Sequence, residues 1–261
     1  GVFVLLLAET LFPSRPGRSA RDRFVHFARN GGVWVATSVI ISMLLGGVLF
    51  GLSLGFESNR VGLLYFTTAP LWAKIAVGFV ALDLADYVFH RMSHEVRWLW
   101  FLHAVHHSDF DVDVTTNLRV HPLHAILTAF SKLVVLAAIG IPLWIWMLRE
   151  LIAVPIVQLQ HSAVRIPARI ERWFAHLIVT PSMHRVHHSP IIGDTNSNFG
   201  GTVPWWDKLF GTFEPEVRRV KPLPPIGAPV PLGAGAPAAG LGLSRSVART
   251  GVLVGCAPSA D

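Results

Sequence analysis

Charged residues are scarce in this sequence, and their scarcity sets the class of protein. Of 261 residues only 15% are Asp, Glu, Lys or Arg, whereas 52% are hydrophobic and the mean hydropathy is +0.49. Soluble domains carry about 25% charged residues, so the composition favours a membrane protein. The sequence has one cysteine, Cys256. A single cysteine excludes an internal disulfide framework.

The sequence also lacks a concentrated basic patch and any haem-binding, flavin-binding or ferredoxin motif. The net charge is +6, but Lys and Arg are scattered or flank apolar segments, as in "RPGRSARDR" at 15–23. Such flanks are typical of membrane helices, so we expect no nucleic-acid partner. Any redox chemistry of this chain would need a separate electron donor.

Long apolar runs, in contrast, are plentiful. Residues 31–56 contain no charged residue, and at about 1.5 Å per residue this run exceeds the roughly 30 Å of bilayer hydrocarbon. A second span is expected at 70–90. The apolar block 122–160 is divided by the turn signal "GIP" at 140–142, which predicts a helical hairpin. The expected fold is all-α: a polytopic membrane helical bundle of about four transmembrane helices with a cytoplasmic helical cap.

Two charges lie inside the predicted hairpin. Lys132 is eight positions before Gly140, and Glu150 is eight after Pro142, so antiparallel helices bring both to the same depth. An unpaired charge at that depth is costly, and we therefore expect the two side chains to face each other. The alternative is a shallow hairpin in which both charges reach water.

The arginines predict the orientation and the domain boundaries. Residues 15–29 carry five arginines, whereas the loop at 57–60 carries Glu57 and Arg60. By the positive-inside rule the basic segment, and with it the end of the next helix near His90, is cytoplasmic. We expect a truncated N-terminal helix and basic loop at 1–30, a membrane domain with a cytoplasmic His-rich cap at 31–219, and a disordered Pro/Gly/Ala-rich tail at 220–261.

Histidines gather in three short motifs. The first is HxxxH, and the second and third are both HxxHH. Positions i, i+3 and i+4 of a helix share a face, so each motif is able to direct its imidazoles toward one point. The motifs consist of His90 and His94, of His103, His106 and His107, and of His184, His187 and His188.

Eight imidazoles exceed what a single ion binds, so the motifs predict two metal ions. Nitrogen ligands without thiolates suit iron, zinc or copper. A pair of metals at a membrane surface favours oxygen chemistry and therefore iron, with zinc as the substitute.

The stretches "DYVFHRMSHEVRWLWFLHAVHHSDFDVDVTTNLRVHP" and "PSMHRVHHSPIIGDTNSNFGGTVPWWDKLFGTF" closely resemble the fatty acid hydroxylase superfamily, in particular its sterol desaturase branch. The resemblance covers about residues 30–215. It implies an integral membrane, non-haem di-iron oxygenase that hydroxylates or desaturates a lipid with O₂ and external electrons. It also implies that all eight clustered histidines are metal ligands.

The resemblance adds further candidates to the site. It implies His161 and His121 as additional ligands, with a hydrogen-bonded turn histidine as the alternative for His121. His124 stands where related sequences often have Glu and is expected either beside the ligands or at the surface.

Three polar residues are the candidate catalytic or supporting groups. Asp86, one turn before His90, could accept the ligand's other ring N–H. Glu95 matches the family's "HE", with a surface salt bridge as the alternative, and Asn198 is expected to hydrogen-bond near the site. His26 is expected to be an interfacial or packing residue.

The expected function is O₂-dependent hydroxylation or desaturation of a sterol-like, carotenoid, fatty-acyl or alkyl-ether lipid at a C–H bond. The electron donor would be of the ferredoxin, cytochrome b5 or reductase type. Two alternatives remain open at this point: a membrane zinc-dependent hydrolase and a non-catalytic metal-binding membrane protein.

Overall fold

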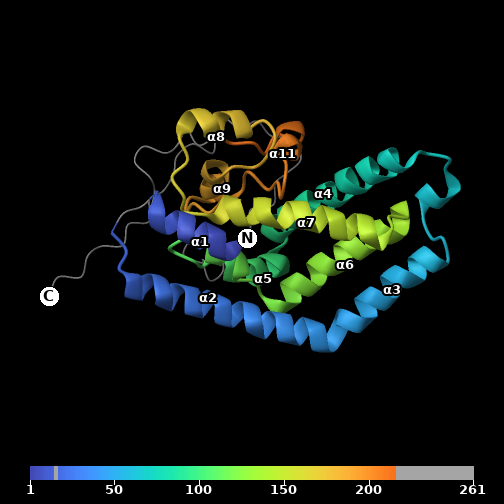
Figure 1. The fold of residues 1–261 in the computed structure, drawn as a ribbon, viewed down its shortest axis with the longest axis horizontal. Coiled ribbons are helices and arrows are strands. Elements are labelled where there is room, and N and C mark those ends of the chain that lie inside the picture. Colours follow the sequence, from blue (N-terminus) through green and yellow to red (C-terminus); the bar gives the residue numbers. More distant parts are fainter. Residues whose placement is uncertain (15–16, 216–261) are drawn as a thin grey trace.

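The computed structural model describes residues 1–14 and 17–215, and this part of the chain is helical (Figure 1). It contains no strand, and its one isolated β-bridge joins Pro13 to Val164. The all-α expectation is therefore confirmed, while the expected tail at 220–261 lies outside the described residues. The elements are α1 (Val2–Leu11), α2 (Ala20–Ile41), the π-helical η1 (Ser42–Gly46), α3 (Gly47–Ser58), η2 (Leu63–Phe66), α4 (Leu71–Glu95), α5 (Arg97–His107), η3 (Val114–Leu118), α6 (Pro122–Ile139), α7 (Leu143–His161), α8 (Ala168–Phe174), α9 (Pro181–His187), α10 (Ile192–Thr195) and α11 (Trp205–Leu209).

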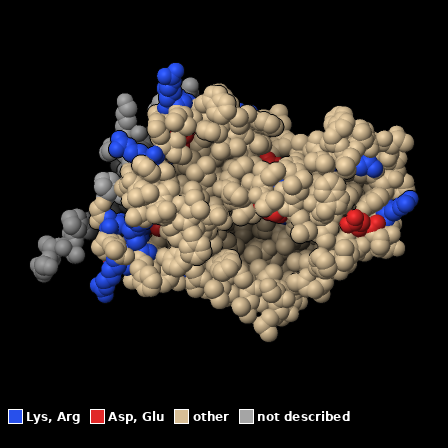
Figure 2. Space-filling view, viewed as in Figure 1, with Lys and Arg blue, Asp and Glu red and all other residues tan. Residues whose placement is uncertain are grey.

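Three segments of the described chain are long and apolar enough to cross a membrane. They are Ala20–Phe66, Pro122–Ile139 and Leu143–His161. The expected number of about four is not confirmed, because α4, although 25 residues long, is not among them. Its apolar stretch carries Lys74, Asp83 and Asp86. Figure 2 shows a face whose middle is almost free of charge, with Lys and Arg gathered toward its ends.

The first span is bent. The sequence predicted a single helix over 31–56, whereas α2 and α3 meet at an angle in Figure 1. The five residues at the bend, Ser42–Gly46, are π-helical, and a π-bulge is a recognised cause of a helix kink. Residues of α2 just before the bend line a cavity together with residues of α6 and α7.

The α6–α7 hairpin turns at Gly140, as the sequence predicted. Gly140 has φ +76 and ends α6 in the left-handed conformation, and Pro142 precedes the first residue of α7. Glycine adopts this conformation at no steric cost. The chain therefore reverses its direction here, and α6 and α7 diverge from the turn (Figure 1), each of them packing against α4.

The predicted pairing inside the hairpin is confirmed. Lys132 Nζ lies 2.8 Å from Glu150 Oε1 and 3.2 Å from Asp86 of α4. Arg149 extends the cluster, since it contacts Asp86 and Glu150 and lies 3.0 Å from Asp83. We call these five residues the charged network. The Lys132 side chain is 12% exposed and that of Glu150 31%, so both charges are held by partners within the protein.

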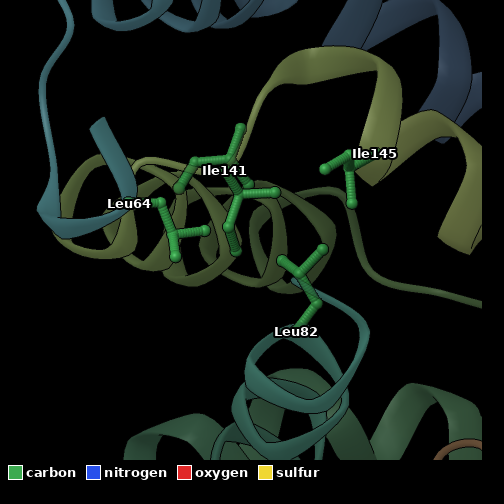
Figure 3. Packing of buried hydrophobic residues seen from close by; sticks show 5 residues of the cluster. Leu64, Leu82, Ile141 and Ile145 are labelled. Carbon is green, nitrogen blue, oxygen red and sulfur yellow. The ribbon is translucent and has the colours of Figure 1, made fainter. Parts of the chain in front are cut away.

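An apolar cluster closes the end of the bundle away from the histidines. Figure 3 shows Leu64 of η2, Leu82 of α4, Ile141 of the turn and Ile145 of α7 directed toward one another, and Leu136 of α6 completes the cluster. Burying an aliphatic side chain contributes about 1.5–3 kcal/mol. This packing fixes α4, α6 and α7 relative to one another.

Among the glycines at this end of the bundle, Gly62 has the least room for a side chain. It has φ +110, and a Cβ built on it would lie 2.1 Å from the backbone nitrogen of Gly140. We expect Gly62→Ala to lower the free energy of unfolding by about 3 kcal/mol or more, because backbone strain and overpacking add. The measurement is thermal unfolding of the detergent-purified chain.

Gly55→Ala is the matched control, since nothing lies within 4 Å of its built Cβ. Replacing glycine by alanine within a helix stabilises by up to about 1 kcal/mol. Equal effects of the two substitutions would contradict the packing described for Gly62.

Candidate metal centre

Four helices bring nine histidines together at the opposite end of the bundle from the apolar cluster. Helix α4 contributes His90 and His94 from its last turns, and α7 contributes its final residue. Helices α5 and α9 contribute the rest, with His188 capping α9. Of the nine, all but His90 are less than 9% exposed.

The nine imidazoles form two groups. Within each group the candidate ligand atoms lie within 4.8 Å of one another. The first histidine group is His90, His94, His103, His107 and His187. The second histidine group is His106, His161, His184 and His188.

The division does not follow the sequence motifs. Each HxxHH was expected to direct its three imidazoles to one point, but both motifs are split between the groups. Consecutive residues of a helix point about 100° apart, whereas residues i and i+4 nearly overlap. On α5, His103 and His107 therefore belong to the first group and His106 to the second. On α9, His184 and His188 belong to the second group and His187 to the first.

Backbone carbonyls orient three of the rings. The Nδ1–H of His90 donates to Phe199 O at 2.8 Å, that of His187 to Ser197 O at 2.8 Å, and that of His161 to Val157 O at 2.7 Å. In these pairings Nδ1 holds the proton, so Nε2 keeps its lone pair. All three rings thus present Nε2 as a potential ligand.

The nitrogen spacing within each group fits a metal ion. Nε2 of His103 lies 3.1 Å from that of His90 and 3.2 Å from that of His107. Ligands at right angles on a metal–nitrogen bond of about 2.1 Å lie about 3.0 Å apart. The first group therefore has the spacing of a coordination shell.

The second group has the same spacing. Nε2 of His161 lies 3.0 Å from that of His106 and 2.9 Å from that of His184, which in turn is 3.2 Å from His188. Since His161 Nε2 carries a lone pair and meets two others at once, a shared cation satisfies this cluster better than protons do.

Unpartnered ring nitrogens support the same reading. His94 is 1% exposed, and Asn196 is the one side chain that approaches its ring as a hydrogen-bond partner, so at least one of its two nitrogens is buried without a partner among the described residues. Nε2 of His187 is likewise buried without a partner. Leaving such a group unsatisfied costs about 1–3 kcal/mol. A metal ion in the first group would remove this cost.

Burial also favours the neutral form of the imidazole rings, which is the form that binds a metal ion. Outside the membrane-spanning segments, desolvation lowers the pKa of His103, His106 and His107 of α5 well below its usual range, and neighbouring imidazoles lower it further. The same cause lowers the pKa of His184 and His188. The rings are therefore neutral near pH 7, which is the state that binds metals.

Asp86 does not orient His90. Its carboxylate lies against Lys132 and Arg149 of the charged network, and the His90 Nδ1–H is taken by Phe199 O. The expectation that this carboxylate fixes the His90 tautomer is wrong. The spacing of four residues placed Asp86 on the correct face, but two cations from α6 and α7 compete more strongly for a carboxylate than a neutral ring does.

Glu95 and Asn198 stand beside the centre rather than in it. Glu95 pairs with Arg91 at 2.8 Å at the surface, so the alternative reading of a surface salt bridge holds. Asn198, at φ +53, donates to Met183 O at 3.0 Å and accepts from Glu214 N at 2.9 Å. It thereby holds the chain next to His184 in place.

His121 lies outside both histidine groups. It caps α6, where its Nδ1 accepts from Leu123 N at 3.2 Å, and this turn role was the alternative reading. His124 stacks on His103 with ring centroids 4.7 Å apart and lies 3.0 Å from Ser93 Oγ, so it stands beside the ligands, which is one of its two expected positions.

His26 has a role that the sequence did not indicate. It was expected at an interface or in packing, but its ring is buried between Asp109 and Asp113 at 2.8 Å from each. This contact fastens the loop after His107 to α2. The alternating acids of that loop were the available signal, but their partner was 83 residues away.

The comparisons with known proteins agree with the geometry. The fatty acid hydroxylase family model matches residues 75–212, and the chain belongs to this family. It is 26% identical over 220 residues to an ornithine lipid hydroxylase of Rhizobium tropici, covering 81% of this chain and 64% of the relative. No solved structure matches the chain significantly.

Two further relatives match a smaller part of the chain. An alkylglycerol monooxygenase of Xenopus tropicalis is 33% identical over 155 residues, covering 54% of this chain and 31% of the relative. A methylsterol monooxygenase 1 of Rattus norvegicus is 28% identical over 163 residues, covering 60% and 50%. The chain thus spans between about a third and two thirds of the length of these relatives.

The two groups predict a stepwise loss of metal. We expect His94→Ala to empty the first group and His184→Ala to empty the second, so that each variant loses about half of the metal bound per chain. The measurement is elemental analysis of protein purified in detergent.

His121→Ala is the control, because His121 lies outside both groups, and it should keep the full metal content. Unchanged metal in both His94→Ala and His184→Ala would contradict the assignment of the two sites.

Proposed function

We propose that the chain is the catalytic part of an O₂-dependent lipid hydroxylase that holds one iron ion in each histidine group. The observation that carries the proposal is the pair of buried imidazole clusters at one end of an apolar helical bundle. Membership in the fatty acid hydroxylase family supports it. Zinc is the substitute metal that the same ligands would accept.

Two irons would supply the oxidising chemistry that side chains lack, since no amino acid activates O₂ toward an alkane C–H bond. The overall change is R–H + O₂ + 2 electrons + 2 protons → R–OH + H₂O. The protein's own groups bind and orient. Carbonyls of Phe199, Ser197 and Val157 hold three rings in one tautomer, and burial keeps the rings of His103, His106, His107, His184 and His188 neutral.

A cavity of about 610 Å³ adjoins the histidines. His90 and His103 of the first group and His106, His161 and His184 of the second line it together. Its wall includes residues of α2, α4, α6 and α7, so a hydrophobic molecule that enters between helices reaches both groups without crossing water. The volume falls within the range of about 300–1,000 Å³ typical of ligand pockets.

Hydroxylation is proposed over desaturation because the relatives reported above are named hydroxylases or monooxygenases. Their names specify an ornithine lipid, an alkylglycerol and a methylsterol. A lipid substrate, taken from the membrane, is the class that these share.

We place the site on the cytoplasmic face and assign electron supply to a separate ferredoxin, cytochrome b5 or reductase. Of the arginines that precede or begin α2, Arg18 pairs with Asp111 and Asp113 in the loop that follows His107, so the basic segment lies at the histidine end of the bundle. The positive-inside rule then makes this end cytoplasmic.

A zinc hydrolase is less well supported. Such an enzyme needs a carboxylate or comparable base beside the metal-bound water, and both histidine groups consist of imidazoles alone. Asp86 is engaged by Lys132 and Arg149, and Glu95 by Arg91. A non-catalytic metal carrier would be expected to place its ligands along a path across the membrane, whereas these lie at one end.

Isotope incorporation tests the proposal. Membranes that contain the iron-loaded chain, a reductant and a lipid extract are exposed to ¹⁸O₂, and we expect a lipid product that contains one ¹⁸O atom. Mass spectrometry of the extract is the measurement.

The same chain loaded with zinc, and the His94→Ala variant, should give no such product. Product that carries oxygen from water, or that forms without O₂ in the zinc-loaded protein, would reject the hydroxylase and favour the hydrolase.

A further inference from the structure

The cavity beside the histidines is elongated along the bundle. On α7 its lining runs from Trp146 to His161, and on α6 from His121 to Lys132. At 1.5 Å per residue these stretches are about 22 Å and 16 Å long. The imidazoles line one end, and four members of the charged network, Asp86, Lys132, Arg149 and Glu150, line the other region.

The wall between these two regions is largely apolar. Phe89 of α4, Ala125 and Ala129 of α6, and Ala153 and Val157 of α7 line it. Small and aliphatic side chains leave room for a hydrocarbon chain and offer it no hydrogen bonds. Figure 2 shows this face of the molecule hollowed near the bend of α2 and α3.

The charged network contains more carboxylate than its own pairing requires. Asp83, Asp86 and Glu150 oppose Lys132 and Arg149, so with all five ionised the network has a formal charge of −1. Ionisable groups at this depth of a membrane protein are expensive and commonly functional. If the network served only to hold the helices together, its positive and negative charges would be expected to be equal in number.

Glu150 is the member with spare capacity. Lys132 Nζ, Trp146 Nε1 and Arg149 Nη1 all donate to its Oε1, at 2.8, 3.1 and 3.0 Å. The structure gives Oε2 no hydrogen bond within the described chain. The Glu150 side chain is 31% exposed, against 18% for Asp86 and 12% for Lys132. Glu150 lines the cavity, and its Oε2 is the carboxylate oxygen that the network leaves without a hydrogen bond.

We propose that the charged network, through Glu150, binds a hydrogen-bond-donating group of the lipid, namely a hydroxyl, an amide N–H or an ammonium, while the lipid's hydrocarbon chain passes along the apolar wall to the histidines. This inference rests on the proposed lipid hydroxylation. Hydrocarbon has no partner for such a group, and the network supplies one. Glu150 precedes His161 by eleven residues, about 16 Å along α7, whereas Asp86 of the same network lies one turn before His90 on α4. The oxidised C–H bond is therefore separated from the recognised group by a short stretch of the hydrocarbon chain.

Two probes with the same hydrocarbon chain distinguish recognition of a hydrogen-bond donor from recognition of an acceptor. Hexadecan-1-ol donates a hydrogen bond, whereas 1-methoxyhexadecane only accepts one. Binding to the full iron-loaded chain in detergent is followed by tryptophan fluorescence, because Trp34 and Trp146 line the cavity. A hydrogen bond to a charged group favours the alcohol by about tenfold or more in Kd.

Variants locate the preference. Glu150→Met removes the acceptor and leaves two carboxylates against two cations, so the alcohol and the ether should bind equally. Glu150→Gln offers a neutral acceptor, and because such a bond is about half as strong, the preference should fall to about threefold. Asp83→Asn is the matched control: it removes one carboxylate from the same network, but Asp83 does not line the cavity, so the tenfold preference should remain.

Equal binding of the two probes to the unmodified chain, or a full preference retained in Glu150→Met and Glu150→Gln, would overturn the inference. Because binding is measured without turnover and iron content is measured separately, the two proposals fail separately. A lost preference in a protein that still makes ¹⁸O-labelled product rejects this inference alone. An intact preference without labelled product rejects the proposed hydroxylation alone.

Discussion

Two histidines that are adjacent in a helix point about 100° apart, and the whole centre depends on this angle. Helices α5 and α9 each carry an adjacent pair, so each helix contributes to both histidine groups. Helix α4 adds two rings to the first group and α7 adds one to the second. The two candidate sites are thus built from shared helices and keep a fixed relation to each other.

The charged network and the apolar cluster act on the same helices. Lys132 of α6 and Arg149 of α7 bind Asp86 of α4, one turn from His90, and Leu82 and Ile145 pack at the far end. Removing one member of a buried ion pair costs about 3–5 kcal/mol. The network therefore holds α4 and α7, which carry His90 and His161, in a fixed relation. In the proposed lipid complex, the Glu150 carboxylate of the same network also accepts a hydrogen bond from the lipid.

The cavity connects these features to the chemistry. It is lined by both histidine groups, by the charged network and by the bent first span. A lipid that enters between helices exchanges one apolar surface for another, so its hydrocarbon chain gains little from entry. Specificity then depends on the few polar groups that the wall presents, in agreement with pockets that are mostly apolar and contain few polar contacts.

Local patterns determined much of this protein. The scarcity of charge predicted apolar helices, "GIP" predicted the hairpin turn, and the positions of Lys132 and Glu150 predicted their contact, because helix geometry and equal depth need no knowledge of distant residues. The three histidine motifs identified eight of the nine clustered rings, and the family resemblance supplied His161. The same patterns did not reveal the π-helical bend at Ser42–Gly46.

Tertiary structure decided what each ring contacts. The His90 ring is oriented by a carbonyl 109 residues away, and His26 lies between acids 83 and 87 residues away. Asp86 pairs with Lys132 and Arg149 and not with His90. His121 caps the N-terminus of α6. These outcomes could not be predicted from spacing, since a side chain within reach of several partners takes the one that the packing of distant helices brings closest.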